Sequence, residues 1–194
     1  MNLKHKKAIN IAVLTAVVML ASPYLLRAQP PNPVVLLETS LGSIKVEIFL
    51  DKSPKTATNF IDYVEARHFD GLIFHRVIAN FMVQGGGYEP GMKERKTRAA
   101  IPNESTNGLE NKRGTLAMAR TPEPDSATSQ FFINVVDNSF LNRSRSSDGY
   151  CVFGKVIEGM EVVDKIKAVK TTRVGAQANI PETDVIIKTA RLAK

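Results

Sequence analysis

The residues from Phe74 to Gly87 combine polar side chains that could grip a ligand with apolar side chains that could hold one. Arg76 and Gln84 stand among phenylalanine, methionine and branched apolar residues, just before the chain reaches three consecutive glycines. A guanidinium donates several hydrogen bonds in a fixed plane, and a glutamine amide both donates and accepts. This mixture is typical of a groove that takes an apolar ligand and grips one amide group.

Two short strands must position these side chains, and we predict them at about 73–78 and 81–84. Side chains alternate between the two faces of a strand, so Phe74 and Arg76 should share one face. His75 should then point away from Arg76, and we interpret it as a structural residue.

Several later stretches follow in a fixed order and strengthen this interpretation. Together with 74–87 they resemble the successive motifs of the cyclophilins, the peptidyl-prolyl cis-trans isomerases. The resemblance covers residues 34–192 and is closest to the bacterial exported (periplasmic) type, which has a similar glycine-rich stretch and following loop. The further stretches that carry it are 114–120, 124–134, 140–142, 150–156 and 159–166.

The resemblance implies which residues form the site. Arg76 matches the family's catalytic arginine, and Gln84 is expected to hold the substrate carbonyl or to orient Arg76. The substrate-binding residues are expected to be an apolar pocket for the proline ring, a backbone rail and three positions along the groove. In that order they are Phe81, Met82, Phe132 and Leu141; Ala119 and Arg120; and Gln130, Phe140 and Tyr150.

The implied reaction breaks no bond. Rotation about a peptide bond faces a barrier of ~18–20 kcal/mol, and exchange of X–Pro isomers takes tens to hundreds of seconds. A guanidinium that donates a hydrogen bond to the twisted prolyl nitrogen would stabilise the transition state by ~1.5–3 kcal/mol. No cofactor is expected. No metal is expected either, because only His68 and His75 follow the leader and no cysteine–histidine cluster exists.

Three positions depart from the family pattern. Phe140 stands where many eukaryotic members have tryptophan, and Tyr150 where the family has a histidine. Gly87 replaces an aspartate of the family pattern, and bacterial relatives share this replacement. None of the three replaces Arg76, so we expect isomerase activity. We also expect weak inhibition by cyclosporin, which the resemblance identifies as a groove ligand, because Phe140 lacks the N–H donor of tryptophan.

The first residues differ from the rest of the chain. Three lysines precede an apolar run from Ala8 to Ala21, and a small residue, Ala28, precedes a proline-rich stretch. This pattern predicts a signal peptide at 1–28, an extended linker at 29–33 and a periplasmic protein. An uncleaved membrane anchor is the alternative, although the run is shorter than the ~20 residues of a spanning helix.

Composition limits the partners. Four of the 26 basic residues and none of the 19 acidic residues lie in 1–28, so cleavage lowers the net charge from +7 to +3. That value gives no support to nucleic-acid binding. We expect a monomer, without stable membrane association after cleavage, that acts on proline-containing unfolded or partly folded polypeptides. Cys151 is the single cysteine, so no intramolecular disulfide forms, and it is expected to be buried.

The coarse pattern predicts a mainly β fold. Ser53 and Pro54 should cap and begin a helix that runs to about Arg67, and a second helix should cover 160–166. Many short strands with two helices indicate a closed antiparallel barrel. The resemblance makes it the cyclophilin-like form, eight strands capped by two α-helices. The other predicted strands are 34–38, 44–50, 115–119, 131–134, 151–157 and 184–190.

Other enzyme classes lack their motifs, since no phosphate-binding loop and no Gly-x-Ser-x-Gly elbow occurs. The remaining alternative is a chaperone whose groove holds proline segments and in which turnover is secondary.

Overall fold

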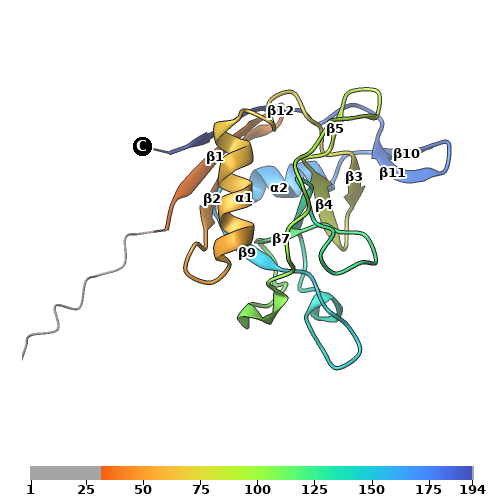
Figure 1. The fold of residues 1–194 in the computed structure, drawn as a ribbon. Coiled ribbons are helices and arrows are strands. Elements are labelled where there is room, and N and C mark those ends of the chain that lie inside the picture. Colours follow the sequence, from red (N-terminus) through yellow and green to blue (C-terminus); the bar gives the residue numbers. More distant parts are fainter. Residues whose placement is uncertain (1–31, 194) are drawn as a thin grey trace, which may run out of the picture. The chain divides into compact units, whose positions relative to one another are not determined.

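The computed structural model describes residues 32–193, and every structural statement here concerns that range (Figure 1). The predicted signal peptide and the first three residues of the predicted linker lie outside it. Within the described residues, no helix is long and apolar enough to cross a membrane.

One antiparallel sheet of eight strands forms the body of the domain. Its first hairpin follows the predicted alternation, because Leu37 pairs with Ile44 and Val35 with Val46, and all four side chains are fully buried. The strand order in the sheet is β12 (Ile187–Leu192), β1 (Val34–Thr39), β2 (Gly42–Ile48), β9 (Val152–Glu158), β7 (Thr115–Met118), β8 (Phe131–Asn134), β4 (Met82–Gly85) and β3 (Arg76–Ile78).

The sheet curls into an open half-barrel, so the predicted closed barrel is wrong. The end strands β3 and β12 form no ladder with each other. The two sides meet through an isolated bridge between Ile73 and Ile186. Backbone hydrogen bonds flank it, from the Phe74 amide to the Val185 carbonyl at 2.9 Å and from the Ile187 amide to the Leu72 carbonyl at 2.7 Å. Because residues 72–75 make these contacts rather than continue β3, the strand is too short to complete a ladder.

This interruption also corrects the predicted alternation. Phe74 is fully buried in the main core together with Val77, whereas Arg76 lies on the groove side. Regular strand geometry begins only at Arg76, so the two-residue period does not extend back to Phe74.

Figure 1 shows the two helices, α1 (Pro54–Glu65) and α2 (Met160–Lys167), beside the strands of the sheet. Both bury apolar side chains in the main core. Phe60 of α1 packs against Phe69, Phe131 and Phe153, with ring centroids 5.0–5.3 Å apart. The side chains of Val163 and Ile166 from α2 are fully buried in the same core.

The start of α1 is held by a residue that sequence spacing did not reveal. Ser53 makes no side-chain cap, and its hydroxyl instead donates to the Val152 carbonyl at 2.9 Å. The carboxylate of Glu104 accepts the backbone amides of Lys55 at 3.2 Å and Thr56 at 2.8 Å. The prediction of a serine cap is therefore wrong, and the free amides of the first turn are satisfied from a distant loop.

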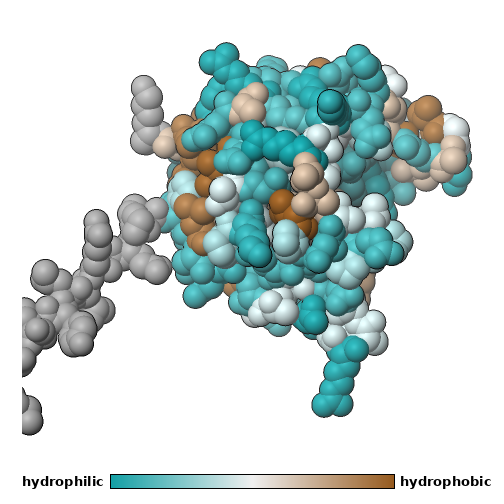
Figure 2. Space-filling view, viewed as in Figure 1, coloured by the Kyte–Doolittle hydropathy of each residue, from teal (hydrophilic) through white to brown (hydrophobic). Residues whose placement is uncertain are grey.

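Smaller elements surround the sheet. A hairpin of β10 (Thr171–Val174) and β11 (Gln177–Pro181), which the sequence pattern did not predict, packs beside β3. Its tip exposes Val174 to solvent, and Figure 2 shows apolar atoms there on an otherwise largely hydrophilic face. The others are β5 (Tyr88–Glu89), β6 (Lys93–Glu94), and the 3-10 helices η1 (Ser105–Asn107) and η2 (Ser139–Leu141).

Cys151 is buried beside the hydroxyl of Thr56, and burial raises the pKa of its thiol. This environment confirms the prediction of a buried cysteine, since the protonated thiol is favoured there.

Candidate active site

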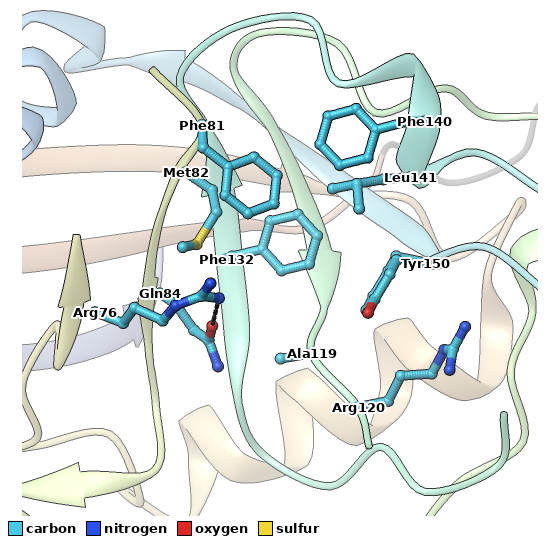
Figure 3. Close-up of a pocket in the computed structure, with 10 residues that line it drawn as sticks. All are labelled: Arg76, Phe81, Met82, Gln84, Ala119, Arg120, Phe132, Phe140, Leu141 and Tyr150. Carbon is cyan, nitrogen blue, oxygen red and sulfur yellow. Dashed lines mark hydrogen bonds between the residues drawn. The ribbon is translucent and has the colours of Figure 1, made fainter. Parts of the chain in front are cut away.

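A groove of about 400 Å³ is lined by residues of the sheet strands β3, β4 and β8, of η2 and of the loops beside them (Figure 3). Every residue that lines it is among those predicted from the sequence. These residues are Arg76, Phe81, Met82, Gln84, Ala119, Arg120, Phe132, Phe140, Leu141 and Tyr150.

Strand register brings the centre of the groove together. Arg76 of β3 lies opposite Gln84 of β4, and Gln84 lies opposite Phe132 of β8. Ala117 of β7 then lies opposite Phe132. Residues paired directly across a sheet project from the same face, so a guanidinium, an amide and a phenyl ring form one row. This is why residues far apart in the chain meet in one site.

The apolar wall of the groove is a small core of its own. Met82, Phe132 and Leu141 are 1%, 4% and 8% exposed and pack with Ala117 and Val152, separately from the main core. We call these five residues the groove cluster. Its side chains are therefore held by mutual packing as well as being available to an apolar ligand.

Two phenylalanine rings close one end of this wall. Phe81 and Phe140 stack with centroids 5.5 Å apart and an angle of 28° between the rings. Phe140 is 69% exposed, whereas Phe81 is partly buried. An aromatic surface of this kind is left open for contact with a ligand.

The polar wall is organised by a chain of side-chain hydrogen bonds. Arg76 donates from Nη1 to Oε1 of Gln84 at 3.3 Å, the bond drawn in Figure 3, and Gln84 donates from Nε2 to Oε1 of Gln130 at 2.9 Å. Gln130 does not line the groove itself but lies in the two adjoining cavities. The structure thus places Gln130 behind Gln84, and two successive hydrogen bonds link it to Arg76.

The two arginines of the groove differ in how their donors are used. Arg120 donates to the carbonyls of Gly149, Thr121 and Pro122 at 2.9–3.1 Å, and its guanidinium lies 4.6 Å from the centre of the Tyr150 ring. Arg76 makes a single side-chain hydrogen bond among the described residues, to Gln84. Arg76 therefore has donors free for a ligand, while Arg120 holds the loop that carries Tyr150.

His75 lies beside the groove, so the prediction that it points away from Arg76 is wrong. Both residues line an adjoining cavity of about 290 Å³, and the His75 ring lies 4.6 Å from that of Tyr88. His75 is 7% exposed, and its Nδ1 has no hydrogen-bond partner among the described residues. Burial, and secondarily the charge of Arg76, lower the pKa of His75 to about 4, so the ring is neutral near pH 7.

A network of asparagines that sequence reasoning missed supports the groove. Asn138 donates to the Phe81 carbonyl at 2.8 Å and to the side chain of Asn134 at 2.7 Å. Asn111 donates to the carbonyls of Leu141 and Tyr150, both at 3.3 Å. All three asparagines are almost completely buried, so these bonds fix the backbone on which the groove residues stand. Their repeated occurrence near the groove motifs was the available signal.

Within the described residues, no cluster of three or more histidine, cysteine, aspartate or glutamate side chains could hold a metal ion. The groove lining has two cations and no carboxylate. What it can do is hold an apolar ring against the groove cluster and present hydrogen-bond donors to an adjacent amide.

Comparison with known proteins agrees with this geometry. The family described as "Cyclophilin type peptidyl-prolyl cis-trans isomerase/CLD" matches residues 34–192. A peptidyl-prolyl cis-trans isomerase of Acinetobacter baylyi is 58% identical over 156 residues, which cover 80% of this chain and 83% of the relative. Peptidyl-prolyl cis-trans isomerase B of Escherichia coli is 54% identical over 164 residues, covering 83% of this chain and 100% of the relative.

A similar solved structure is that of a cyclophilin-type peptidyl-prolyl cis-trans isomerase of Cryptosporidium parvum, crystallised in the presence of the dipeptide Ala-Pro. It has a TM-score of 0.72 and 27% identity, and the match covers 83% of this chain and 99% of that one. The sequence match over most of the chain and the shared fold lead to one conclusion: this chain belongs to the cyclophilin family of peptidyl-prolyl cis-trans isomerases.

Proposed function

We propose that this cyclophilin-type peptidyl-prolyl cis-trans isomerase accelerates X–Pro rotation in exported proteins, and that Arg76 is its catalytic residue. The observation that carries the proposal is the availability of the Arg76 guanidinium, with one hydrogen bond, beside an apolar wall, in contrast to Arg120, which makes four. The reaction needs no covalent intermediate, since only rotation about the amide has to be eased.

The catalytic step follows from the electronic structure of the amide. As the X–Pro bond twists, its double-bond character is lost and the prolyl nitrogen becomes a hydrogen-bond acceptor. A donor from Arg76 to that nitrogen strengthens only in the twisted state, so it lowers the barrier rather than merely tightening binding. Gln84 keeps the guanidinium in place by accepting a hydrogen bond from it.

The substrate is a proline-containing segment of an unfolded or partly folded polypeptide. In our proposal the proline ring packs against Phe81, Met82, Phe132 and Leu141, while Ala119 and Arg120 form the backbone rail beside the chain. The Ala-Pro dipeptide named with the Cryptosporidium parvum structure supports this class of ligand.

Substitution of Arg76 with alanine tests the mechanism. Loss of one charge-assisted hydrogen bond of about 1.5–3 kcal/mol should lower kcat/KM for a short proline peptide by about 10- to 150-fold. The thermal midpoint should hardly change, because Arg76 is partly exposed. Arg98→Ala is the matched control, since Arg98 forms an ion pair with Asp62 and does not line the groove. Near-normal activity of Arg76→Ala would reject Arg76 as the catalytic group.

The same variant separates catalysis from simple holding of proline segments. If Arg76→Ala loses isomerase activity yet still delays aggregation of an unfolded protein as well as the unchanged chain does, the groove also acts as a chaperone. If both activities fall together, holding of unfolded chains also requires the Arg76 guanidinium.

The exported location rests on the basic and apolar pattern of residues 1–28. We propose cleavage after Ala28 and a mature periplasmic protein. Mass spectrometry of the protein from its native cell should find Gln29 at the N-terminus. An intact Met1 in the membrane fraction would support the anchor instead.

A further inference from the structure

Three consecutive glycines follow Gln84, and their surroundings differ. A Cβ at Gly85 would lie 3.0 Å from the Phe74 ring and 3.1 Å from the Ile73 carbonyl oxygen. Gly86 has a φ of +89°, and a Cβ there would lie 2.8 Å from the Ser129 carbonyl oxygen. These two glycines are therefore required by the core and by the backbone.

Gly87 meets a different neighbour. A Cβ at this position would lie 2.6 Å from Cγ of Gln130 and 2.7 Å from its Cδ and Nε2. Its three nearest atoms thus all belong to one flexible side chain, and no backbone atom is among them. The missing Cβ at Gly87 provides the space in which the amide of Gln130 lies.

The side-chain amide of Gln130 belongs to the chain of hydrogen bonds that leads to Arg76. Oε1 of Gln130 accepts from Nε2 of Gln84 at 2.9 Å. A glutamine amide has its donor and acceptor on opposite sides, so engaging Nε2 of Gln84 turns its Oε1 toward Arg76, where the distance is 3.3 Å. If Gln130 moved, the 3.3 Å bond from Arg76 would be the only bond left in this chain to orient the Gln84 amide, and Arg76 and Gln84 would both lose positional restraint.

We propose that Gly87 is a positioning residue for the isomerase reaction, acting through Gln130 and Gln84 on the orientation of Arg76. The inference rests on the proposed catalytic role of Arg76. Gly87 does not line the groove, and the three atoms nearest to an added Cβ all belong to Gln130, so we expect its effect to pass through the two amides.

The experiment is Gly87→Ala, measured with a proline-peptide isomerisation assay. We expect kcat/KM to fall about three- to tenfold, in line with the loss of one net hydrogen bond, mostly in kcat. The thermal midpoint should not fall, because the clash is relieved by moving one side chain. The side-chain amide resonances of Gln84 in NMR spectra should shift.

A double-mutant cycle shows whether the effect passes through Gln130. Gln130→Ala should cause a similar loss, and adding Gly87→Ala to it should cause no further loss. Additive losses, or unchanged activity and unchanged Gln84 resonances in Gly87→Ala, would overturn the inference. If Gly87→Ala fails to fold, unshifted Gln84 resonances in Gln130→Ala would overturn it equally.

Gly91→Ala is the matched glycine control. Gly91 has a φ of +76° and open space around its Cα, so alanine there should lower the thermal midpoint without changing kcat/KM. Retained activity in Arg76→Ala would defeat the proposed mechanism itself. Loss of activity in Arg76→Ala without loss in Gly87→Ala would defeat only this inference.

Discussion

The two walls of the groove are stabilised in different ways. The apolar wall is the groove cluster, whose side chains are buried against one another as in any core. The polar wall consists of Arg76 and Gln84, which are partly exposed, and two side-chain hydrogen bonds join them to each other and to Gln130 behind them. One wall therefore contributes to folding and to binding, while the other contributes mainly to orientation.

This difference separates stability from activity. Truncating a buried apolar side chain removes transfer free energy and leaves a cavity, whereas truncating a partly exposed polar one mostly exchanges protein contacts for water. Substitutions in the apolar wall should lower both stability and activity. Those in the polar wall should lower activity alone. His75, which lies beside the groove, should instead affect stability because it is buried.

Phe132→Ala should have the largest effect on stability. Phe132 is 4% exposed in the groove cluster, so its truncation should lower the free energy of unfolding by about 3 kcal/mol and weaken binding of proline peptides. Urea unfolding measures the first effect and the isomerase assay the second. Phe140→Ala serves as control, since this 69% exposed ring should change stability by less than about 0.5 kcal/mol. Equal losses of unfolding free energy in the two variants would contradict the distinction between a packed wall and an exposed rim.

His75 should make stability depend on pH between about 6.5 and 4. Its pKa is lowered from 6.5 to about 4 in the folded protein, so the unfolded chain binds the extra proton in this range. Stability is thus complete above pH 6.5 and falls on acidification, by about 3 kcal/mol at most. His75→Phe should flatten this part of the curve.

Other groups titrate nearby and have to be separated from His75. Burial also lowers the pKa of His68, so only the difference between wild type and His75→Phe isolates His75. The pKa values of the Asp70 and Glu47 carboxyls are lowered mainly by hydrogen bonds from Arg191 and Asn32. The stability that these two carboxylates contribute is therefore lost only as the pH falls below the ordinary carboxyl pKa. Identical pH curves for the two proteins between pH 6.5 and 4 would contradict the neutral buried ring.

Phe140→Trp should alter ligand affinity with little effect on folding. Indole adds area and an N–H donor to the exposed ring that stacks on Phe81, so cyclosporin should bind about 30- to 150-fold more tightly, or about 2–3 kcal/mol. Inhibition curves for both proteins in one isomerase assay test this. Tight inhibition of the unchanged protein, or no gain with tryptophan, would remove Phe140 as the reason for weak binding.

Much of this site could be predicted from the sequence because its residues lie in short local motifs. The register of β3 and β4 follows from a short hairpin, so Arg76 and Gln84 could be predicted to face the same groove. The resemblance supplied the more distant members, Phe132, Leu141 and Tyr150, which the structure gathers into the same cavity. Burial of Cys151 and the extents of α1 and α2 also followed from composition and spacing.

Tertiary structure decided the features that depend on partners far along the chain. Closure of the barrel required a ladder between β3 and β12, and the structure instead joins residues 71–74 to the segment at 185–187 by isolated backbone bonds. The cap of α1 comes from Glu104, and the space for Gln130 comes from Gly87. Local periodicity reports which face of an element is apolar, but not which distant polar group will satisfy it. Those choices arise only when packing brings donors and acceptors together and leaves each buried one in need of a partner.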